Sequence, residues 1–189
     1  MVAIAASAGD VEAVCRIVAA IPSSCTASFF VVIHIGEHRS HLPTILNAIG
    51  MLPASHGRNG TLIEPSHIYI APPDHHMLVG AEHIWLNQGP KVHFTRPAAD
   101  PLLQSLAETY GDKAVGVVLS GMGDDGAAGL RSINEHGGLA IVEDPAETPY
   151  PGMPEAALAA VNHALCLSLK GDRGASRRTQ LAPDSSVQF

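Results

Sequence analysis

The chain has 189 residues, of which 46% are hydrophobic and 15% are charged, and its formal net charge is −7 at pH 7. This length suits one domain with a sizeable core, and the acidic balance argues against a nucleic-acid partner, because phosphates require clustered basic residues. No apolar run approaches the ~20 residues of a membrane span. The three cysteines lack CxxC spacing, which is typical of reduced thiols. We therefore expect a cytoplasmic protein that is not inserted in a membrane.

The first half of the chain alternates between apolar strand-like runs and amphipathic helices. Val2–Ala6 and Phe29–Ile33 are apolar throughout, as strands covered on both faces are. The spacing of apolar residues favours helices at Asp10–Ile21 and Leu42–Ile49. Three short runs bounded by Pro, Gly and Asp then predict an inserted antiparallel hairpin or meander: Ser66–Ala71, His76–Gly80 and His83–Asn87.

The second half resumes the strand–helix alternation. We expect Asp100 to cap the first of its helices, because Pro101 follows at the first helical position. The predicted helices are Asp100–Tyr110, Ala127–His136 and Pro154–Val161, and the predicted strands are Ala114–Leu119, Leu139–Val142 and Ala164–Leu169. The pattern predicts an α/β fold with a doubly wound, mostly parallel sheet and helices on both faces. Residues 1–170 form this domain, and 171–189, which lack periodicity, are expected to be a disordered tail.

Three polar side chains follow strands that such a fold brings to one sheet edge. Ser7 and His34 come directly after the first two strands, and Asp125 lies in the loop after the strand Ala114–Leu119. Ligand and active sites of open α/β sheets form beyond the carboxyl ends of the strands. A hydroxyl, an imidazole and a carboxylate there are the ingredients of an acyl-transfer triad, in which the imidazole removes the serine proton.

Each of these residues also has a simpler interpretation. Ser7 and Asp10 match a capping box at the start of a helix. His34 can be a hydrogen-bonded core histidine, and Asp125 can cap the helix Ala127–His136. The nucleophile motif G-x-S-x-G does not match AASAG around Ser7, and the glycines of residues 121–126 lack the P-loop lysine.

The eleven histidines raise the question of a metal site. His34, His38 and His41 follow a strand and do not share a helix face, as the HExxH motif requires. His75 and His76 are adjacent in the middle of the chain. We expect no metal and no cofactor.

Six strings in one order cover roughly residues 2–170: IAASAGDVEAV, VVIHI, IYIAPPDHHMLV, RPAADPLLQSLAETYG, VVLSGMGDDGAAGL and GMPEAAL. By these strings the chain resembles the catalytic domain of the chemotaxis receptor methylesterase family (CheB). The resemblance implies hydrolysis of glutamate γ-methyl esters on the cytoplasmic helices of methyl-accepting chemoreceptors, and deamidation of certain receptor glutamines. By motif it assigns Ser7, His34 and Asp125 as the triad. It places Met122, Ala8 and Gly9 at the oxyanion and substrate-positioning site.

The chain departs from the family pattern at the nucleophile, where AASAGD stands in place of a sequence like GASTGG. The alternative function is therefore a catalytically weakened adaptor that binds receptor helices without efficient turnover. Because Met1 stands directly before the first strand, we expect no receiver domain; a stand-alone chain and an excised one both fit. A monomer is compatible with the sequence. The segment Ile68–Leu86, with His75, His76 and Met77, is a candidate lip for receptor docking, and a purely structural hairpin is an equally good interpretation.

Overall fold

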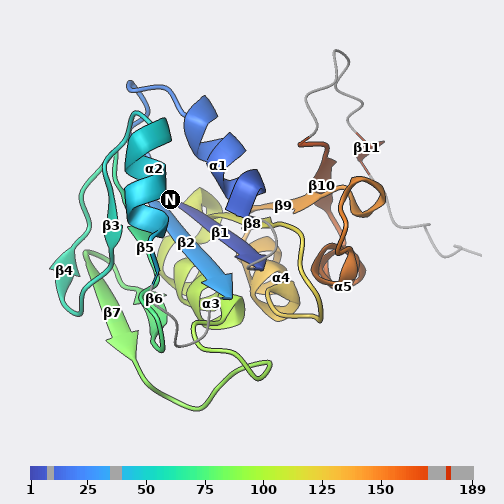
Figure 1. Ribbon diagram of the computed structural model, residues 1–189. Helices are drawn as coiled ribbons and strands as arrows, with labels where there is room; N and C mark the ends of the chain where they lie inside the picture. Colours follow the sequence, from blue (N-terminus) through green and yellow to red (C-terminus); the bar gives the residue numbers. More distant parts are fainter. Residues whose placement is uncertain (8–10, 35–39, 170–177, 180–189) are drawn as a thin grey trace, which may run out of the picture.

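The computed structural model describes residues 1–7, 11–34, 40–169 and 178–179. A large sheet lies between two layers of helices, and a smaller sheet sits at one end (Figure 1). The strands are β1 (Val2–Ser7), β2 (Phe29–His34), β3 (Ala54–His56), β4 (Thr61–Leu62), β5 (Ile68–Ile70), β6 (His76–Val79), β7 (His83–Asn87), β8 (Val115–Val118), β9 (Leu139–Glu143), β10 (Ala164–Leu167) and β11 (Arg178–Thr179). The helices are α1 (Val11–Ala20), α2 (Leu42–Ile49), α3 (Ala99–Tyr110), α4 (Ala127–Glu135) and α5 (Gly152–Ala160), with short 3₁₀ turns η2 (Gly111–Lys113) and η3 (Pro145–Glu147).

The large sheet has the order β11-β10-β9-β8-β1-β2-β5-β3, and all neighbouring pairs are parallel except β10 and β11. From β1 the chain builds outward through β2 on one side and later returns to β8 on the other side. This arrangement confirms the predicted doubly wound fold. It also creates a switch point at the carboxyl ends of β1 and β8, which is where such folds form their sites.

Two apolar clusters cover the two faces of the sheet. Successive residues of a strand point to opposite faces, so Ile4 packs with α1 and α2, whereas Ala3 and Ala5 pack with α3, α4 and α5. On β2, Phe30 and Val32 belong to the same cluster as Ala3 and Ala5. Continuing the alternation places the side chains of the last residues of β1 and β2 on the face covered by α3.

The structure confirms an inserted antiparallel element, but one of its strands differs from the predicted set. β6 pairs with β7 and β7 with β4, so β4, β7 and β6 form the second sheet. The run Ser66–Ala71, expected in that insertion, instead contributes β5 to the parallel sheet between β2 and β3. The reason is burial on both faces, since Ile68, Tyr69 and Ile70 are all buried.

The remaining boundaries follow the sequence pattern within a few residues, and α2 and β7 coincide with their predicted ranges. Most of the expected tail lies outside the described residues; Arg178–Thr179 form β11 and pair antiparallel with β10. Within the described ranges, no helix combines the length and apolar character needed to cross a membrane.

Candidate active site

Ser7 and His34 occupy the last positions of two neighbouring parallel strands. They are register partners in the pairing of β1 with β2, and parallel neighbours lie ~4.8 Å apart. The alternation along both strands directs their side chains to the face that α3 covers. The backbone N–H of Ser7 also donates to the carbonyl oxygen of Ser120 at the end of β8, 3.1 Å away. The serine is thus held at the switch point of the sheet.

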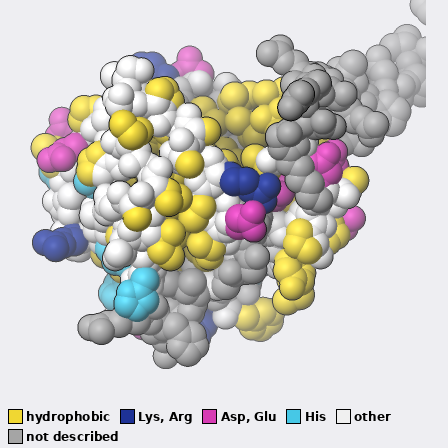
Figure 2. Space-filling view, turned by 45° about the horizontal axis from the view of Figure 1, so that its top comes forward, with side chains coloured by type: hydrophobic (Ala, Val, Ile, Leu, Met, Phe, Trp, Pro, Cys, Tyr) yellow, Lys and Arg dark blue, Asp and Glu magenta, His cyan; other side chains and the backbone are white. Residues whose placement is uncertain are grey.

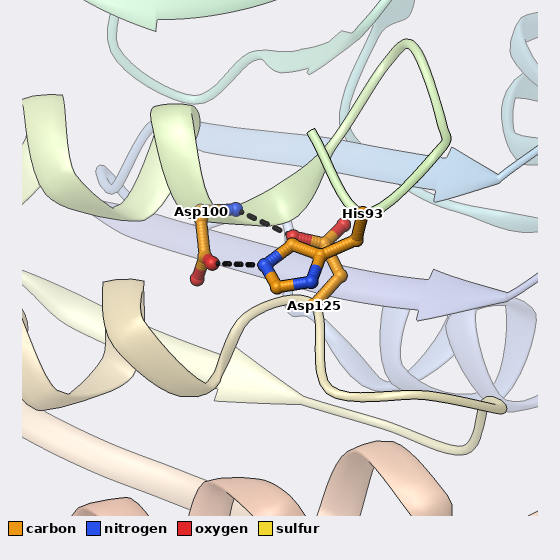
Figure 3. A group of neighbouring side chains, drawn as sticks. All are labelled: His93, Asp100 and Asp125. Atoms are coloured by element: carbon orange, nitrogen blue, oxygen red, sulfur yellow. Dashed lines mark hydrogen bonds and ion pairs between the residues drawn. The ribbon is translucent and has the colours of Figure 1, made fainter. Parts of the chain in front are cut away.

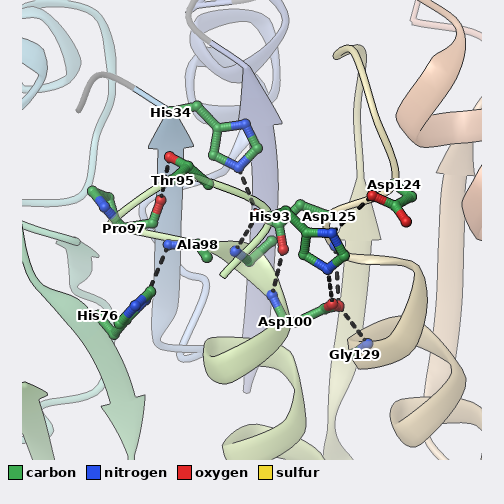
Figure 4. A network of polar contacts seen from close by, with 12 residues as sticks. His34, His76, His93, Thr95, Pro97, Ala98, Asp100, Asp124, Asp125 and Gly129 are labelled. Atoms are coloured by element: carbon green, nitrogen blue, oxygen red, sulfur yellow. Dashed lines mark hydrogen bonds and ion pairs between the residues drawn. The ribbon is translucent and has the colours of Figure 1, made fainter. Parts of the chain in front are cut away.

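His34 is hydrogen-bonded to Asp125. Its Nε2 lies 2.6 Å from Asp125 Oδ2, and the two side chains are 15% and 2% exposed (Figure 4). With Nε2 occupied by the carboxylate, Nδ1 is the ring nitrogen that can accept a proton. In the part of the chain that the structure describes, no hydrogen bond joins the Ser7 hydroxyl to this ring. The structure therefore brings His34 and Asp125 into contact and sets Ser7 on the adjoining strand.

Asp125 is also fixed by the start of α3. Its Oδ2 accepts from the backbone N–H of Ala99 at 2.7 Å, and its Oδ1 accepts from that of Asp100 at 3.0 Å. Burial by itself would raise the pKa of Asp125, but the hydrogen bonds from His34 and from these two amides lower it below its ordinary value. The buried carboxylate is therefore ionised, and it is held by two backbone N–H groups as well as by the imidazole of His34.

The expectation that Asp100 caps its own helix is wrong. Ala98 is the N-cap residue of α3, and its side chain makes no cap hydrogen bond. Asp100 lies inside the first turn, where its Oδ1 accepts from Gly126 at 3.0 Å and Gly129 at 2.7 Å, so it caps α4. Gly126 is the N-cap of α4 with φ of 94°, a left-handed conformation without a capping side chain.

The two helices thus exchange their capping carboxylates. Asp125 precedes α4 but satisfies amides at the start of α3, so the interpretation of Asp125 as the cap of α4 is also wrong. Each carboxylate satisfies N–H groups that have no intrahelical partner and lies at the positive end of the helix dipole. This reciprocal arrangement fixes Asp125 relative to both helices, which is the rigidity that an orienting acid requires.

His93, which the sequence analysis did not select, joins the same network (Figure 3). Its Nε2 lies 2.8 Å from Asp100 Oδ2, and its Nδ1 lies 2.8 Å from Asp124 Oδ1. Burial would lower the pKa of His93, but Asp100, Asp125 and Asp124 together raise it. His93 lies outside any helix or strand, in a turn before α3, so no helix or strand periodicity of the sequence carries a signal for its contact with Asp100.

Three polar side chains lie close enough together to bind a metal ion. Ligand atoms of His93, Asp100 and Asp125 lie within 4.8 Å of one another. However, every carboxylate oxygen of Asp100 and Asp125 already accepts a hydrogen bond from a backbone N–H or a histidine ring. A hydrogen-bond network accounts for the group without an ion.

Of the three residues named for the candidate lip, two do not face solvent, whereas His75 is partly exposed. Met77 and His76 are buried; Met77 belongs to the core. His76 Nε2 lies 3.0 Å from the carbonyl oxygen of Pro90, and its Nδ1 accepts from Ala98 at 3.3 Å. These two residues therefore pack the small sheet against the start of α3 instead of facing a partner.

Of the three residues predicted for the oxyanion site, only Met122 belongs to the described part of the chain; Ala8 and Gly9 lie outside it. Met122 lies in the loop between β8 and α4, with its side chain 75% exposed. This loop passes close to the serine: a Cβ added at Gly121 would lie 3.0 Å from Ser7 Cβ. Met122 is therefore within one residue of the contact with Ser7. His38, named with the candidate metal ligands, also lies outside the described residues.

Comparisons with known proteins find relatives of this chain. The family model described as CheB methylesterase matches residues 2–171. A Pyrococcus horikoshii protein named protein-glutamate methylesterase/protein-glutamine glutaminase is 37% identical over 163 residues, which are 83% of this chain and 44% of that protein. The protein-glutamate methylesterase FrzG of Myxococcus xanthus is 39% identical over 84% of this chain and 48% of its own length.

Two further similarities cover most of both chains compared. A Leptospira interrogans relative is 33% identical over 171 residues, and the alignment spans 89% of each chain. The crystal structure of the Thermotoga maritima CheB methylesterase catalytic domain superposes with a TM-score of 0.81 at 29% identity, over 87% of this chain and 91% of that one. The chain spans less than half the length of the Pyrococcus and Myxococcus proteins that it matches.

Proposed function

This chain belongs to the CheB methylesterase family, and we propose that it hydrolyses the γ-methyl esters of glutamate side chains on the cytoplasmic helices of chemoreceptors. The observation that carries the proposal is the hydrogen bond of 2.6 Å between His34 and Asp125 beside the strand end that holds Ser7. The location that follows is the cytoplasm, where those receptor helices lie.

In this proposal Ser7 is the nucleophile and His34 its general base. Because Nε2 donates to Asp125, the Nδ1 lone pair accepts the proton of the Ser7 hydroxyl as its oxygen attacks the ester carbonyl. The protonated ring then returns the proton to the departing methanol. Asp125 holds the tautomer and stabilises the imidazolium, and its lowered pKa keeps it ionised in this role.

The negative charge that develops on the carbonyl oxygen requires backbone donors. We assign these to the loop that carries Met122 and to the residues after Ser7, Ala8 and Gly9. The close passage of Gly121 past Ser7 supports the first assignment. Donors fixed in advance at such a position commonly contribute roughly 10²- to 10³-fold in rate. Water then attacks the acyl-enzyme, with His34 as the base for the second time.

Deamidation of receptor glutamines is the second reaction in this proposal. The same attack on a side-chain amide expels ammonia in place of methanol. The Pyrococcus relative carries both activities in its name. The adaptor alternative is less well supported, because a protein that only binds receptor helices needs no imidazole oriented by a buried carboxylate.

The test is Ser7→Ala, with Ser132→Ala on α4 as a control that removes a hydroxyl away from the site. We expect methanol release from a methylated receptor fragment to fall roughly 10³-fold or more in Ser7→Ala, with the thermal midpoint unchanged. Unaltered turnover together with a loss of about 1 kcal/mol in stability would instead identify Ser7 as a helix cap.

The double variant Ala8→Thr with Asp10→Gly tests the adaptor alternative. A large rise in the rate of ester hydrolysis would mean that the natural chain is catalytically impaired.

A further inference from the structure

A tight turn lies in the segment between β7 and α3. Val92 and Thr95 exchange both backbone hydrogen bonds, at 3.1 and 2.9 Å. The two central residues, His93 and Phe94, have φ of 48° and 62°. Positive φ at both central positions is the pattern of a type I′ turn, which normally takes Asn and Gly. Two bulky residues here are strained, and such strain persists where the surrounding structure holds the turn in place.

The two central side chains have opposite surroundings. The ring of His93 is 31% exposed and contacts Asp100 and Asp124, as described above. Phe94 is 99% exposed, more than any other large hydrophobic residue in the described part of the chain. A single exposed apolar side chain is ordinary on a protein surface. Phe94 differs because its backbone is fixed and because its neighbour is tied to the proposed active site.

Contacts of the neighbouring residue His93 link the turn to that site. His93, the adjacent residue, bonds to Asp124, which directly precedes Asp125 in the chain. It also bonds to Asp100, whose backbone N–H donates to Asp125. Asp125 in turn holds His34 (Figure 4). These contacts hold the turn beside Asp125, so Phe94 is an exposed residue directly next to a side chain of the network around the proposed site.

We infer that Phe94 is a substrate-contacting residue whose ring packs on the apolar side chains next to the methylated glutamate of a receptor helix. The inference rests on the proposed function. On a helix, the residues three and four positions away from a glutamate lie ~5–6 Å from it, so an exposed residue next to the site can reach them while the ester enters it.

The negative net charge of the chain favours an apolar contact over charge attraction as the way Phe94 engages a receptor helix. The net charge is −7, and Asp124 beside the turn is 69% exposed. Lys and Arg are scattered on the face shown in Figure 2. A glutamate-bearing helix thus gains little from long-range attraction, whereas a rigid aromatic ring provides contact area at a low cost in side-chain entropy.

The experiment compares two substrates that share the same ester bond. One is a receptor cytoplasmic fragment that carries glutamate γ-methyl esters, and the other is N-acetylglutamate γ-methyl ester amide, a single residue without flanking side chains. The test variant is Phe94→Asn, because asparagine tolerates positive φ and so preserves the turn while the ring is removed. Phe94→Leu keeps an apolar side chain at the same position.

We expect Phe94→Asn to lower kcat/KM for the receptor fragment about tenfold or more, mainly through KM, and to leave the single-residue ester unchanged. Phe94→Leu should recover most of the loss. The matched control is Met51→Asn, since Met51 is 67% exposed and lies between α2 and β3, at the amino ends of the parallel strands and away from the carboxyl ends that carry the proposed site. Both substrates should be unaffected by that change.

Three other results would overturn the inference. Unchanged kcat/KM on both substrates would leave the esterase intact and remove Phe94 from recognition. An equal fall on both would mean that the turn acts on the chemistry and that the ring makes no contact with the receptor. If the unmodified chain hydrolyses neither ester, the proposed function itself fails, and the inference fails with it.

Discussion

The two helix layers on the sheet bury different kinds of groups. On one face, α1 and α2 bury only apolar side chains, among them Val14, Val18 and Leu46. On the other face, α3 buries the Asp100 carboxylate, and the loop before α4 buries Asp125. Both carboxylates are satisfied by backbone N–H groups of the opposite helix. Among these four helices and the loop before α4, the buried carboxylates thus lie in the layer that carries the proposed chemistry, although strand ends and loops of the described chain also bury Ser28, His76, Ser120 and Glu143.

This comparison shows how a buried charge can be retained at acceptable cost. An ionised carboxylate in an apolar interior is strongly unfavourable unless hydrogen bonds replace its lost hydration. The starts of α3 and α4 supply four such N–H groups to Asp100 and Asp125. The layer of α1 and α2 buries apolar side chains and contributes stability mainly through packing. Mutations in the two layers should therefore affect different properties.

The largest expected effect comes from Asp125→Asn in the polar layer. One amide oxygen cannot replace two carboxylate oxygens that accept from Ala99, Asp100 and His34, and the amide would favour the wrong tautomer of the imidazole. We expect kcat for the methyl ester to fall by roughly 10³- to 10⁴-fold. Steady-state methanol release measures it.

A matched control lies in the other layer. Glu12→Gln neutralises a carboxylate in the first turn of α1, where the side chain is 82% exposed, and should leave kcat unchanged. If Asp125→Asn reduced kcat no more than Glu12→Gln, the carboxylate would have no role in catalysis.

The second prediction concerns the apolar layer. Leu46 is fully buried between α2 and the sheet, and Leu46→Ala removes apolar contacts and leaves a cavity. We expect the free energy of unfolding to fall by about 2–5 kcal/mol, measured by urea denaturation. The kcat of the folded fraction should stay unchanged. A fall in kcat comparable to that of Asp125→Asn would contradict the separation of the two layers.

The smallest effect is a pH dependence at His93. Its pKa is raised in the folded protein by Asp100, Asp125 and Asp124, against the effect of burial. A histidine whose pKa is raised by folding stabilises the folded state. This stabilisation is complete below the pKa of the unfolded chain, about 6.5, and is lost as the pH rises through the pKa of the folded protein. We expect His93→Gln to lower the thermal midpoint more at about pH 5.5 than at about pH 8.5.

The control for that measurement is His136→Gln, where the ring bonds to the carbonyl oxygen of Ser132. That variant measures what the loss of an exposed ring at a helix end does to the midpoint at each pH, and the effect of His93→Gln is read relative to it. Asp125 behaves in the opposite direction to His93, since its lowered pKa contributes stability above about pH 4 that is lost as the pH falls through the folded value. An effect of His93→Gln that increased toward high pH would contradict the ion pairs described for its ring.

The amino-acid pattern by itself determined the fold class and the position of two site residues. Continuous apolar runs predict strands covered on both faces, and the alternation with helices implies parallel pairing. Ser7 and His34 follow two such runs, so their place at one sheet edge could be predicted. The range of α2 and the hairpin of β6 and β7 also follow from local apolar periodicity and turn residues.

Only the tertiary structure decided which side chains meet across the sequence. Asp100 resembles the cap of its own helix, yet it caps α4, because the start of α4 lies against the start of α3. β5 is as short as a hairpin strand, but its residues are buried on both faces of the large sheet, where it pairs in parallel with β2. His93 joins the site through a turn of positive φ, which no local preference of His or Phe predicts. Such contacts depend on the packing of distant segments, and their energy arises only when those segments exclude water together.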